Sequence, residues 1–338
     1  MRRYVVARLV FLTLMLFGLL CITFVLSHVA PGDPARLAAG PDASAAMVET
    51  LRAKYGLDRP LSVQFARYAR GLVSGDLGES IRSHNAVATD LVRYFPNTFE
   101  LVTLALLLAV VVGIPLGMLA AVYQNRWVDH VVRVLSVSGV ALPAFWFGLM
   151  LQLLLAQHLA LLPLGGRLNL TTLPPAPITH LLFVDAALRA QWSTLADAVR
   201  HAVLPVVTLC FPALASIMRV NRSEMIEVLR QEYITSVRAH GFSTFRIVTR
   251  YALKNAMIPT LTMIGLRYGW MLGGTVLVET VFDWPGIGLY AVSSALSSDF
   301  QPIMGVTLVI GVNFMVANLL VDLAYGWLDP RIRLRSPA

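Results

Sequence analysis

The sequence predicts an all-α polytopic membrane protein with six transmembrane helices, and three observations lead to this class. Of the 338 residues, 57% are hydrophobic and only 14% are charged. The mean hydropathy of +0.69 means that the chain has more apolar surface than the core of a soluble domain can hide. The apolar residues also fall in runs of roughly 20 residues, the length that a helix needs to cross the hydrocarbon of a bilayer.

Six apolar runs are predicted to span the membrane: 9–30, 99–122, 134–162, 202–218, 258–282 and 302–328. The uncharged stretch of the first run exceeds the roughly 7–15 residues of a signal-peptide core, so we expect it to stay in the mature chain as a helix. Several spans contain helix breakers, such as Pro143 in the third and Gly273 in the fifth. We expect these mostly to permit kinks and close helix contacts, with flexible gating as the alternative.

The basic residues follow membrane topology, although a net charge of +8 is also compatible with a nucleic-acid partner. Lys and Arg are not gathered into one basic domain with interleaved aromatics, so no nucleic acid is expected. They flank the spans instead, at both termini and in the segments between spans two and three and between spans four and five. The segment between spans five and six contains acidic residues and no Lys or Arg. Both termini, 1–8 and 329–338, are therefore predicted to be cytoplasmic.

The loops are too short for a folded extramembrane domain of ordinary size, so the core at 99–328 is the domain. Helical spacing of apolar residues predicts two short amphipathic helices, near 47–55 and 61–72, in the extracytoplasmic loop 31–98. The segment 163–201 begins with turn-forming prolines and glycines, which favour an external hairpin or cap. A plain connector explains this composition equally well.

Enzyme chemistry and metal binding have little support in the sequence. Cys21 and Cys210 both lie inside predicted spans, which supports neither a disulfide framework nor a thiolate metal cluster. The seven histidines are scattered, without metal-ligand spacing. The phosphate-binding pattern Gly-x-x-x-x-Gly-Lys-Ser/Thr is absent, so the chain is not expected to hydrolyse ATP.

The cytoplasmic loop 219–257 is the most informative segment, because it combines a helical apolar pattern with many charges. Gly241 follows a helical run and is typical of a helix C-terminus, and Ser243 can cap the start of another helix. The loop is therefore predicted to form a helix, a tight turn and a second helix outside the membrane. An amphipathic connector resting on lipid headgroups is the alternative.

The same loop carries a resemblance to a known family, in the run Tyr233-Ile234-Thr235-Ser236-Val237-Arg238-Ala239-His240-Gly241 and the later run Asn255-Ala256-Met257-Ile258-Pro259. These resemble the "EAA loop" of ABC-importer permeases, most closely that of dipeptide, oligopeptide and nickel permeases. Two features depart from the pattern: Thr235-Ser236-Val237 stands in place of Glu-Ala-Ala, and His240 stands in place of Lys. Landmarks such as Gly75-Asp76-Leu77-Gly78-Glu79-Ser80 and Asp329-Pro330-Arg331 extend the resemblance to the whole chain, which is similar to the B-type, first-permease subunit.

The resemblance implies a type I ABC-importer permease fold with a cytoplasmic coupling helix, in a bacterial cytoplasmic (inner) membrane. It implies half of a pathway for dipeptides, oligopeptides, glutathione-like molecules or nickel complexes. The implied partners are a second homologous permease, two ATP-binding subunits and an extracytoplasmic solute-binding protein, besides membrane lipid. ATP and Mg would bind to the partner ATPases, and this chain would bind no cofactor. The expected docking residues are Arg238, Ala239, His240, Gly241 and Phe242.

The two alternative functions are a self-sufficient secondary transporter and an intramembrane enzyme. A secondary transporter usually shows internal repeats and midplane carboxylates, and no clear repeat is visible. Matched catalytic pairs are also lacking.

Arg267 is the one permanent charge well inside a predicted span, at a depth of roughly 13 Å. It is expected to pair with Asp322 or Asn318 of span six, to line the translocation pathway and attract a carboxylate, or to snorkel to the inner interface. The candidate pathway residues are Arg267, Asn313, Asn318 and Asp322.

Overall fold

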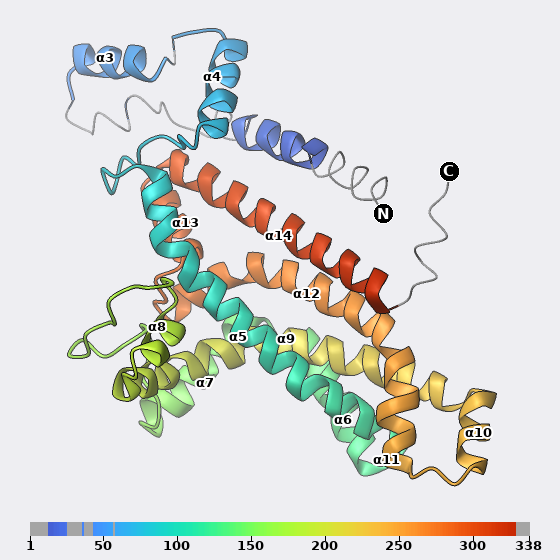
Figure 1. The fold of residues 1–338 in the computed structure, drawn as a ribbon. Helices are drawn as coiled ribbons and strands as arrows, with labels where there is room; N and C mark the ends of the chain where they lie inside the picture. The colour runs from blue at the N-terminus through green and yellow to red at the C-terminus, as the bar shows by residue number, and fades with distance from the viewer. Residues whose placement is uncertain (1–12, 26–35, 37–42, 57, 329–338) are drawn as a thin grey trace, which may run out of the picture. The chain divides into compact units, whose positions relative to one another are not determined.

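The computed structural model describes residues 13–25, 36, 43–56 and 58–328, and its ordered elements in these ranges are helices (Figure 1). The chain divides into two compact units. The first comprises residues 1–98 with 285–315, and the second comprises residues 99–284 with 316–338. Two long helices, α5 (Val87–Val122) and α14 (Phe300–Leu328), run from one unit into the other.

The first unit confirms the two short helices predicted in the long loop, as α3 (Ala45–Tyr55) and α4 (Leu61–Val73). Ser44 caps α3 by accepting a hydrogen bond from the Met47 amide, and Gly56 ends the helix with a φ of 68°. This unit also holds α13 (Ile287–Leu296) and the apolar helix Thr13–Val25. The predicted span 9–30 contains that helix and otherwise falls outside the described residues.

Two buried carboxylates hold the start of α5 and the start of α14. Asp90, in the first turn of α5, accepts hydrogen bonds from the Ser83 hydroxyl (2.6 Å) and the Tyr290 hydroxyl (2.9 Å). Asp299, which directly precedes α14, accepts one from the Ser80 hydroxyl (2.7 Å). Because a helix N-terminus carries partial positive charge, both carboxylates are favourably placed.

The second unit is built around α9 (Trp192–Leu229), on which α6 (Trp127–Ala141), α7 (Ala144–Leu151), α8 (Leu182–Leu188) and α12 (Leu253–Val281) pack. Small residues bring the backbones close together. A β-carbon at Gly139 would lie 2.5 Å from that of Ala215, and one at Gly117 would lie 2.9 Å from the carbonyl oxygen of Met218. Packing of this kind is typical of helices in lipid, where the hydrophobic effect does not drive association.

Four helices in the described part of the chain are long and apolar enough to cross a membrane: Val87–Val122, Trp192–Leu229, Thr244–Val281 and Phe300–Leu320. A fifth span exists if the bent pair α6 and Ala144–His158 counts as one. The single span predicted at 134–162 is therefore wrong in shape, because it begins at Trp127 and bends by 108°. Leu142 is extended (φ −82°, ψ 127°), as expected of a residue before proline.

The helices that contain the predicted spans four and five extend beyond the apolar runs. The apolar run stops at Met218, but α9 continues as a helix through Arg219 and Arg222 to Leu229. On the other side, helical structure begins at Thr244. The charged loop predicted at 219–257 therefore contains the last turns of one long helix and the first turns of another.

Candidate functional site

The predicted helix-turn-helix forms at residues 231–246, which we call the hairpin. It consists of α10 (Glu232–Ala239), a turn, and α11 (Thr244–Arg246), which continues through the π-helical stretch Ile247–Ala252 into α12 (Figure 1). Gly241 has a φ of 78°, and the Ser243 hydroxyl accepts a hydrogen bond from the Arg246 amide (3.4 Å). Both local interpretations of the sequence are confirmed.

An apolar core fixes the base of the hairpin. Ile234 is fully buried against Met225 of α9, the turns that lead into α12, and Ala121 at the end of α5. The Tyr233 hydroxyl also accepts a hydrogen bond from the side-chain amide of Asn255 (2.6 Å). A displacement of the hairpin would therefore be passed to three long helices, since closely packed elements move together.

The outer side of the hairpin is exposed. Arg238, Ala239, His240 and Gly241 are all exposed, as a docking role requires. Phe242 is half-buried, with its ring 5.7 Å from that of Tyr251 and the Arg246 guanidinium 4.9 Å above it. Phe242 thus stabilises the turn from inside.

Phe245 was missed by the sequence analysis. Its side chain is 78% exposed and lies in the first turn after Ser243, beside the exposed tip. Large aromatic side chains are enriched among the residues that carry most of the energy of a protein-protein contact, so Phe245 is a candidate for such a contact. The available signal was an aromatic residue two positions after a helix cap in a charged loop.

Arg267 lies half-buried on α12, at the edge of a face with exposed apolar side chains. Trp270 and Leu277 on this face are 76% and 55% exposed, whereas Leu272 and Val278 on the other face are buried. Among the described side chains, no carboxylate lies within ion-pair distance of Arg267. Its electrostatic neighbour is another cation, Arg219 of α9.

The other predicted pathway residues are on α14. Asn313 and Asn318 are half-buried, and the side chain of Asp322 lies outside the described part. The predicted contact of Arg267 with span six therefore stays a prediction.

Residues 163–181, which we call the strap, cross the opposite end of the unit from the hairpin. The Gln152 side chain donates hydrogen bonds to the carbonyls of Leu164 (2.7 Å) and Val281 (3.0 Å). The Gly166 backbone amide donates one to the Phe282 carbonyl (2.8 Å). This segment was predicted to be either a cap or a plain connector. Its anchors favour the cap.

A buried ion pair adds to these anchors. Arg167 pairs with Glu100 of α5, with side chains only 14% and 6% exposed, and Glu100 also accepts a hydrogen bond from the Phe183 amide (2.8 Å). Burial lowers the pKa of Arg167, and the Glu100 carboxylate opposes that shift. Glu100 was also missed by the sequence analysis, because its partner is 67 residues away.

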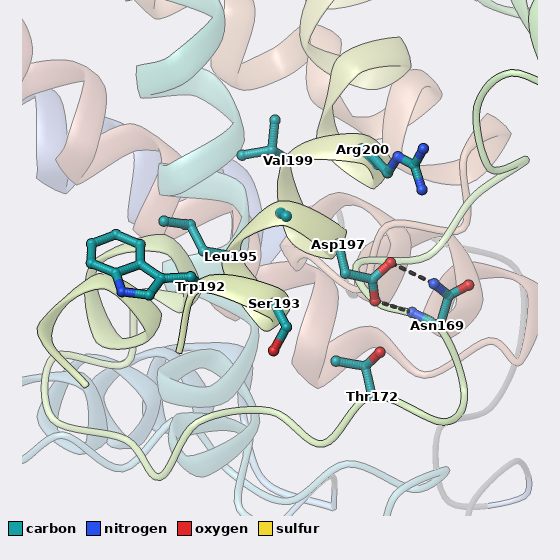
Figure 2. A pocket seen from close by; sticks show the side chains of 9 residues that line it. Asn169, Thr172, Trp192, Ser193, Leu195, Asp197, Val199 and Arg200 are labelled. Carbon is teal, nitrogen blue, oxygen red and sulfur yellow. Dashed lines mark hydrogen bonds between the residues drawn. The ribbon is translucent and has the colours of Figure 1, made fainter. Parts of the chain in front are cut away.

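A cavity of about 590 Å³ lies between the strap and the first turns of α9 (Figure 2). Asp197 closes one side by accepting hydrogen bonds from the backbone amide (2.9 Å) and side-chain amide of Asn169. Trp192 and Arg200 also line the cavity. Within the described residues, no three His, Cys, Asp or Glu side chains are grouped so as to hold a metal ion.

Comparison with known proteins agrees with this architecture. Residues 113–334 match the family described as "Binding-protein-dependent transport system inner membrane component", and residues 1–102 match its N-terminal component. A probable D,D-dipeptide transport system permease of Escherichia coli K12 is 47% identical, over 95% of this chain and 94% of its own length. A dipeptide transport system permease of Alkalihalophilus pseudofirmus is 38% identical over 98% of this chain and 100% of its own. A glutathione transport system permease of E. coli O6:H1 is 36% identical over 99% and 100%. The chain therefore belongs to the binding-protein-dependent inner membrane components, as a non-catalytic permease subunit of an ABC importer of the peptide family.

Proposed function

We propose that this permease forms half of a pathway for dipeptides or similarly small peptides, opposite a second homologous permease subunit, and that the hairpin docks one of two ATP-binding subunits. The relatives are named for D,D-dipeptide, dipeptide and glutathione transport. These solutes share a small peptide backbone and a free carboxylate. A solute-binding protein and ATPase partners follow from the family, and the proposed stoichiometry is one ATPase for each permease.

The observation that carries the proposal is the hairpin itself, which has a rigid apolar base and an exposed tip. Closure of the ATPases on ATP would displace the tip, and the buried contacts of Ile234 would pass the displacement to α9 and α12. Rigid movement of packed helices can then alternate the access of the pathway. ATP and Mg stay on the partner subunits.

Phe245→Ala tests the docking. An exposed aromatic anchor is typically worth about 2 kcal/mol or more at an interface, so we expect the ATPase subunits to dissociate during purification and uptake to fail. Phe145→Ala on α7 is the matched control, because Phe145 is also exposed, at 41%. Gly241→Asp should uncouple transport in the same assay. Retained ATPases with normal uptake in both hairpin variants would contradict the docking.

Arg267 is proposed to face the pathway. A central arginine costs about 2.5–3.5 kcal/mol in lipid, so the half-buried Arg267 side chain requires water or a protein partner at this depth. The neighbouring Arg219 adds positive charge, which would attract a solute carboxylate. Asn313, Asn318 and Asp322 are proposed as further polar groups of the pathway.

A double-mutant cycle separates this role from a structural pair. If Arg267→Gln assembles normally but slows only carboxylate-bearing solutes, the pathway role holds. If it abolishes assembly and Asp322→Asn causes no further loss, the two residues form a structural pair instead.

The proposed orientation places the hairpin and both termini in the cytoplasm and the strap outside. In a background lacking Cys21 and Cys210, Ser44→Cys should react with an impermeant reagent in whole cells. Ser236→Cys should react only after the inner face is opened. Both positions are exposed, so the reverse pattern would show that the orientation is inverted.

The solute class is tested in the reconstituted importer with its binding protein. Stimulation of ATP hydrolysis by dipeptides, of D,D or L,L configuration, supports the proposal. Stimulation by a nickel complex alone would refute it.

A further inference from the structure

Asp129 is a fully buried carboxylate at the end of the unit that carries the hairpin, and no role considered so far includes it. It lies in the first turn of α6 and binds Arg222 of α9 through both carboxylate oxygens, one of them at 2.9 Å from Nη2. Arg133, one turn further along α6, also donates to it, and so does the Asn125 amide (2.9 Å). Two arginines and a backbone amide therefore converge on one carboxylate.

The rest of the α6 face that meets α9 consists of small or apolar residues. Its other buried residues are Val132, Ser136 and Gly139, and the Ser136 hydroxyl donates to the Val132 carbonyl of its own helix (2.7 Å). These residues pack closely on α9, with Gly139 against Ala215, but they add no charged group to the contact between the two helices. The two-pronged bond from Arg222 to Asp129 is directional, and buried ionic groups are best known for fixing register.

Arg222 also lies where movement would enter the unit. It precedes by one helical turn Met225, which packs against Ile234 at the base of the hairpin. The other end of α6 leads into the 108° bend before Pro143. The helix α6 thus connects the end of α9 that holds the hairpin to this bend, which we call the elbow.

We propose that Asp129 is a positioning residue for transport: it locks the register of α6 on α9, so that α6 and its elbow follow the hairpin when an ATPase moves it. This inference rests on the proposed docking of the hairpin. Without the lock, the ATPases would still bind and hydrolyse ATP, but α6 would slip and the pathway would not open fully.

The test uses the complete importer in proteoliposomes, with uptake and ATP hydrolysis measured together. In Asp129→Asn, we expect normal binding of the ATPases and a fall of at least about fivefold in solute transported per ATP, the lower end of typical coupling between sites. Arg133→Gln is the matched control. Arg133 binds the same carboxylate from α6 itself, so it does not join α6 to α9. Removal of the Arg133 charge should therefore leave the amount of solute transported per ATP near that of the wild type. An unchanged ratio in Asp129→Asn overturns the proposal.

A structural readout separates register from simple destabilisation. Spin labels at the exposed positions His130 of α6 and Glu227 of α9 should keep one distance through the nucleotide cycle in the wild type. In Asp129→Asn, the distribution of distances between the two labels should be broader or should change with the nucleotide. If Asp129→Asn fails to fold, Arg222→Lys, which keeps the charge but loses the two-pronged geometry, should show the same slip. A constant distance in the variant that is measured refutes the lock. Failure of the docking itself would appear separately, as normal ATPase binding in Phe245→Ala.

Discussion

The hairpin and the strap lie at opposite ends of the same unit and are held in different ways. The hairpin stands on an apolar core and exposes its tip, including Phe245 at 78%. The strap is bound along its length by polar groups, namely the buried Glu100 and the partly buried Gln152 and Asp197. An apolar base allows the hairpin to move as one body with α9 and α12. Directional anchors restrain the strap at each point separately.

The comparison predicts that the strap is the more sensitive of the two to loss of a single polar group. The largest effect is expected for Glu100→Ala, which removes the buried carboxylate that binds both Arg167 and the Phe183 amide. Removal of one partner of a buried ion pair typically costs about 3–5 kcal/mol. We expect a large fall in the apparent melting temperature of the purified permease and in its membrane abundance. Asp197→Ala, which removes hydrogen bonds to the exposed Asn169 of the strap and a contact with His201 (3.4 Å), is the control and should lose less.

Steric fit gives the next prediction, again at the strap. A β-carbon at Gly165 would lie 2.4 Å from the Phe282 carbonyl oxygen, so one of two backbones must shift. Gly165→Ala should therefore cost about 3 kcal/mol, at the upper end for overpacking. The adjacent Gly166 has a φ of 77°, and a β-carbon there would meet only the Leu168 carbonyl oxygen at an ordinary 3.9 Å, so Gly166→Ala should cost only the backbone strain of about 1 kcal/mol. Equal melting temperatures for the two variants would show that the strap is not clamped against Phe282.

These differences explain what the sequence could predict. The hairpin was predictable because its determinants are local: a helical apolar period, Gly241 in a left-handed turn and Ser243 as a cap. The anchors of the strap join residues far apart in the chain, such as Gln152 with Val281, and no local pattern announces them. The same holds for Asp129 and Arg222, 93 residues apart.

Span boundaries were less predictable for a different reason. The length of an apolar run indicates how much of a helix lies in lipid, whereas the helix itself ends where its backbone hydrogen bonds stop. The helix α9 continues 11 residues beyond Met218, to Leu229. Pro143 was recognised as a breaker. The size of the bend depends on how α6 and α7 each pack on α9, which the sequence alone does not contain.

Substitution of Gly241 should change the stability of the hairpin only through backbone strain, because no atom lies within 4 Å of where a β-carbon would be. Gly241→Ala is therefore expected to lower stability by about 1 kcal/mol. Gly241→Asn should lower it less, since asparagine adopts the left-handed region more readily. The two variants can be compared by melting temperature and by proteolysis at the tip. Equal losses would contradict a purely conformational role.

The smallest effect is expected at the end of the strap and only in acid. Burial alone would raise the pKa of Asp185, but hydrogen bonds from the Thr179 hydroxyl and from backbone amides, including that of Ile178, outweigh it and hold the pKa below the ordinary value of 3.8. A carboxyl with a lowered pKa in the folded state contributes stability above its unfolded pKa and loses it as pH falls through the folded one. The melting-temperature gap between wild type and Asp185→Asn should therefore be present at neutral pH and narrow below pH 3.8. Thr179→Val keeps the carboxyl but removes the hydroxyl donor, so its loss of stability should begin at a higher pH than in the wild type. A gap that stays constant into acid would mean that the Asp185 carboxylate does not hold the strap by its charge.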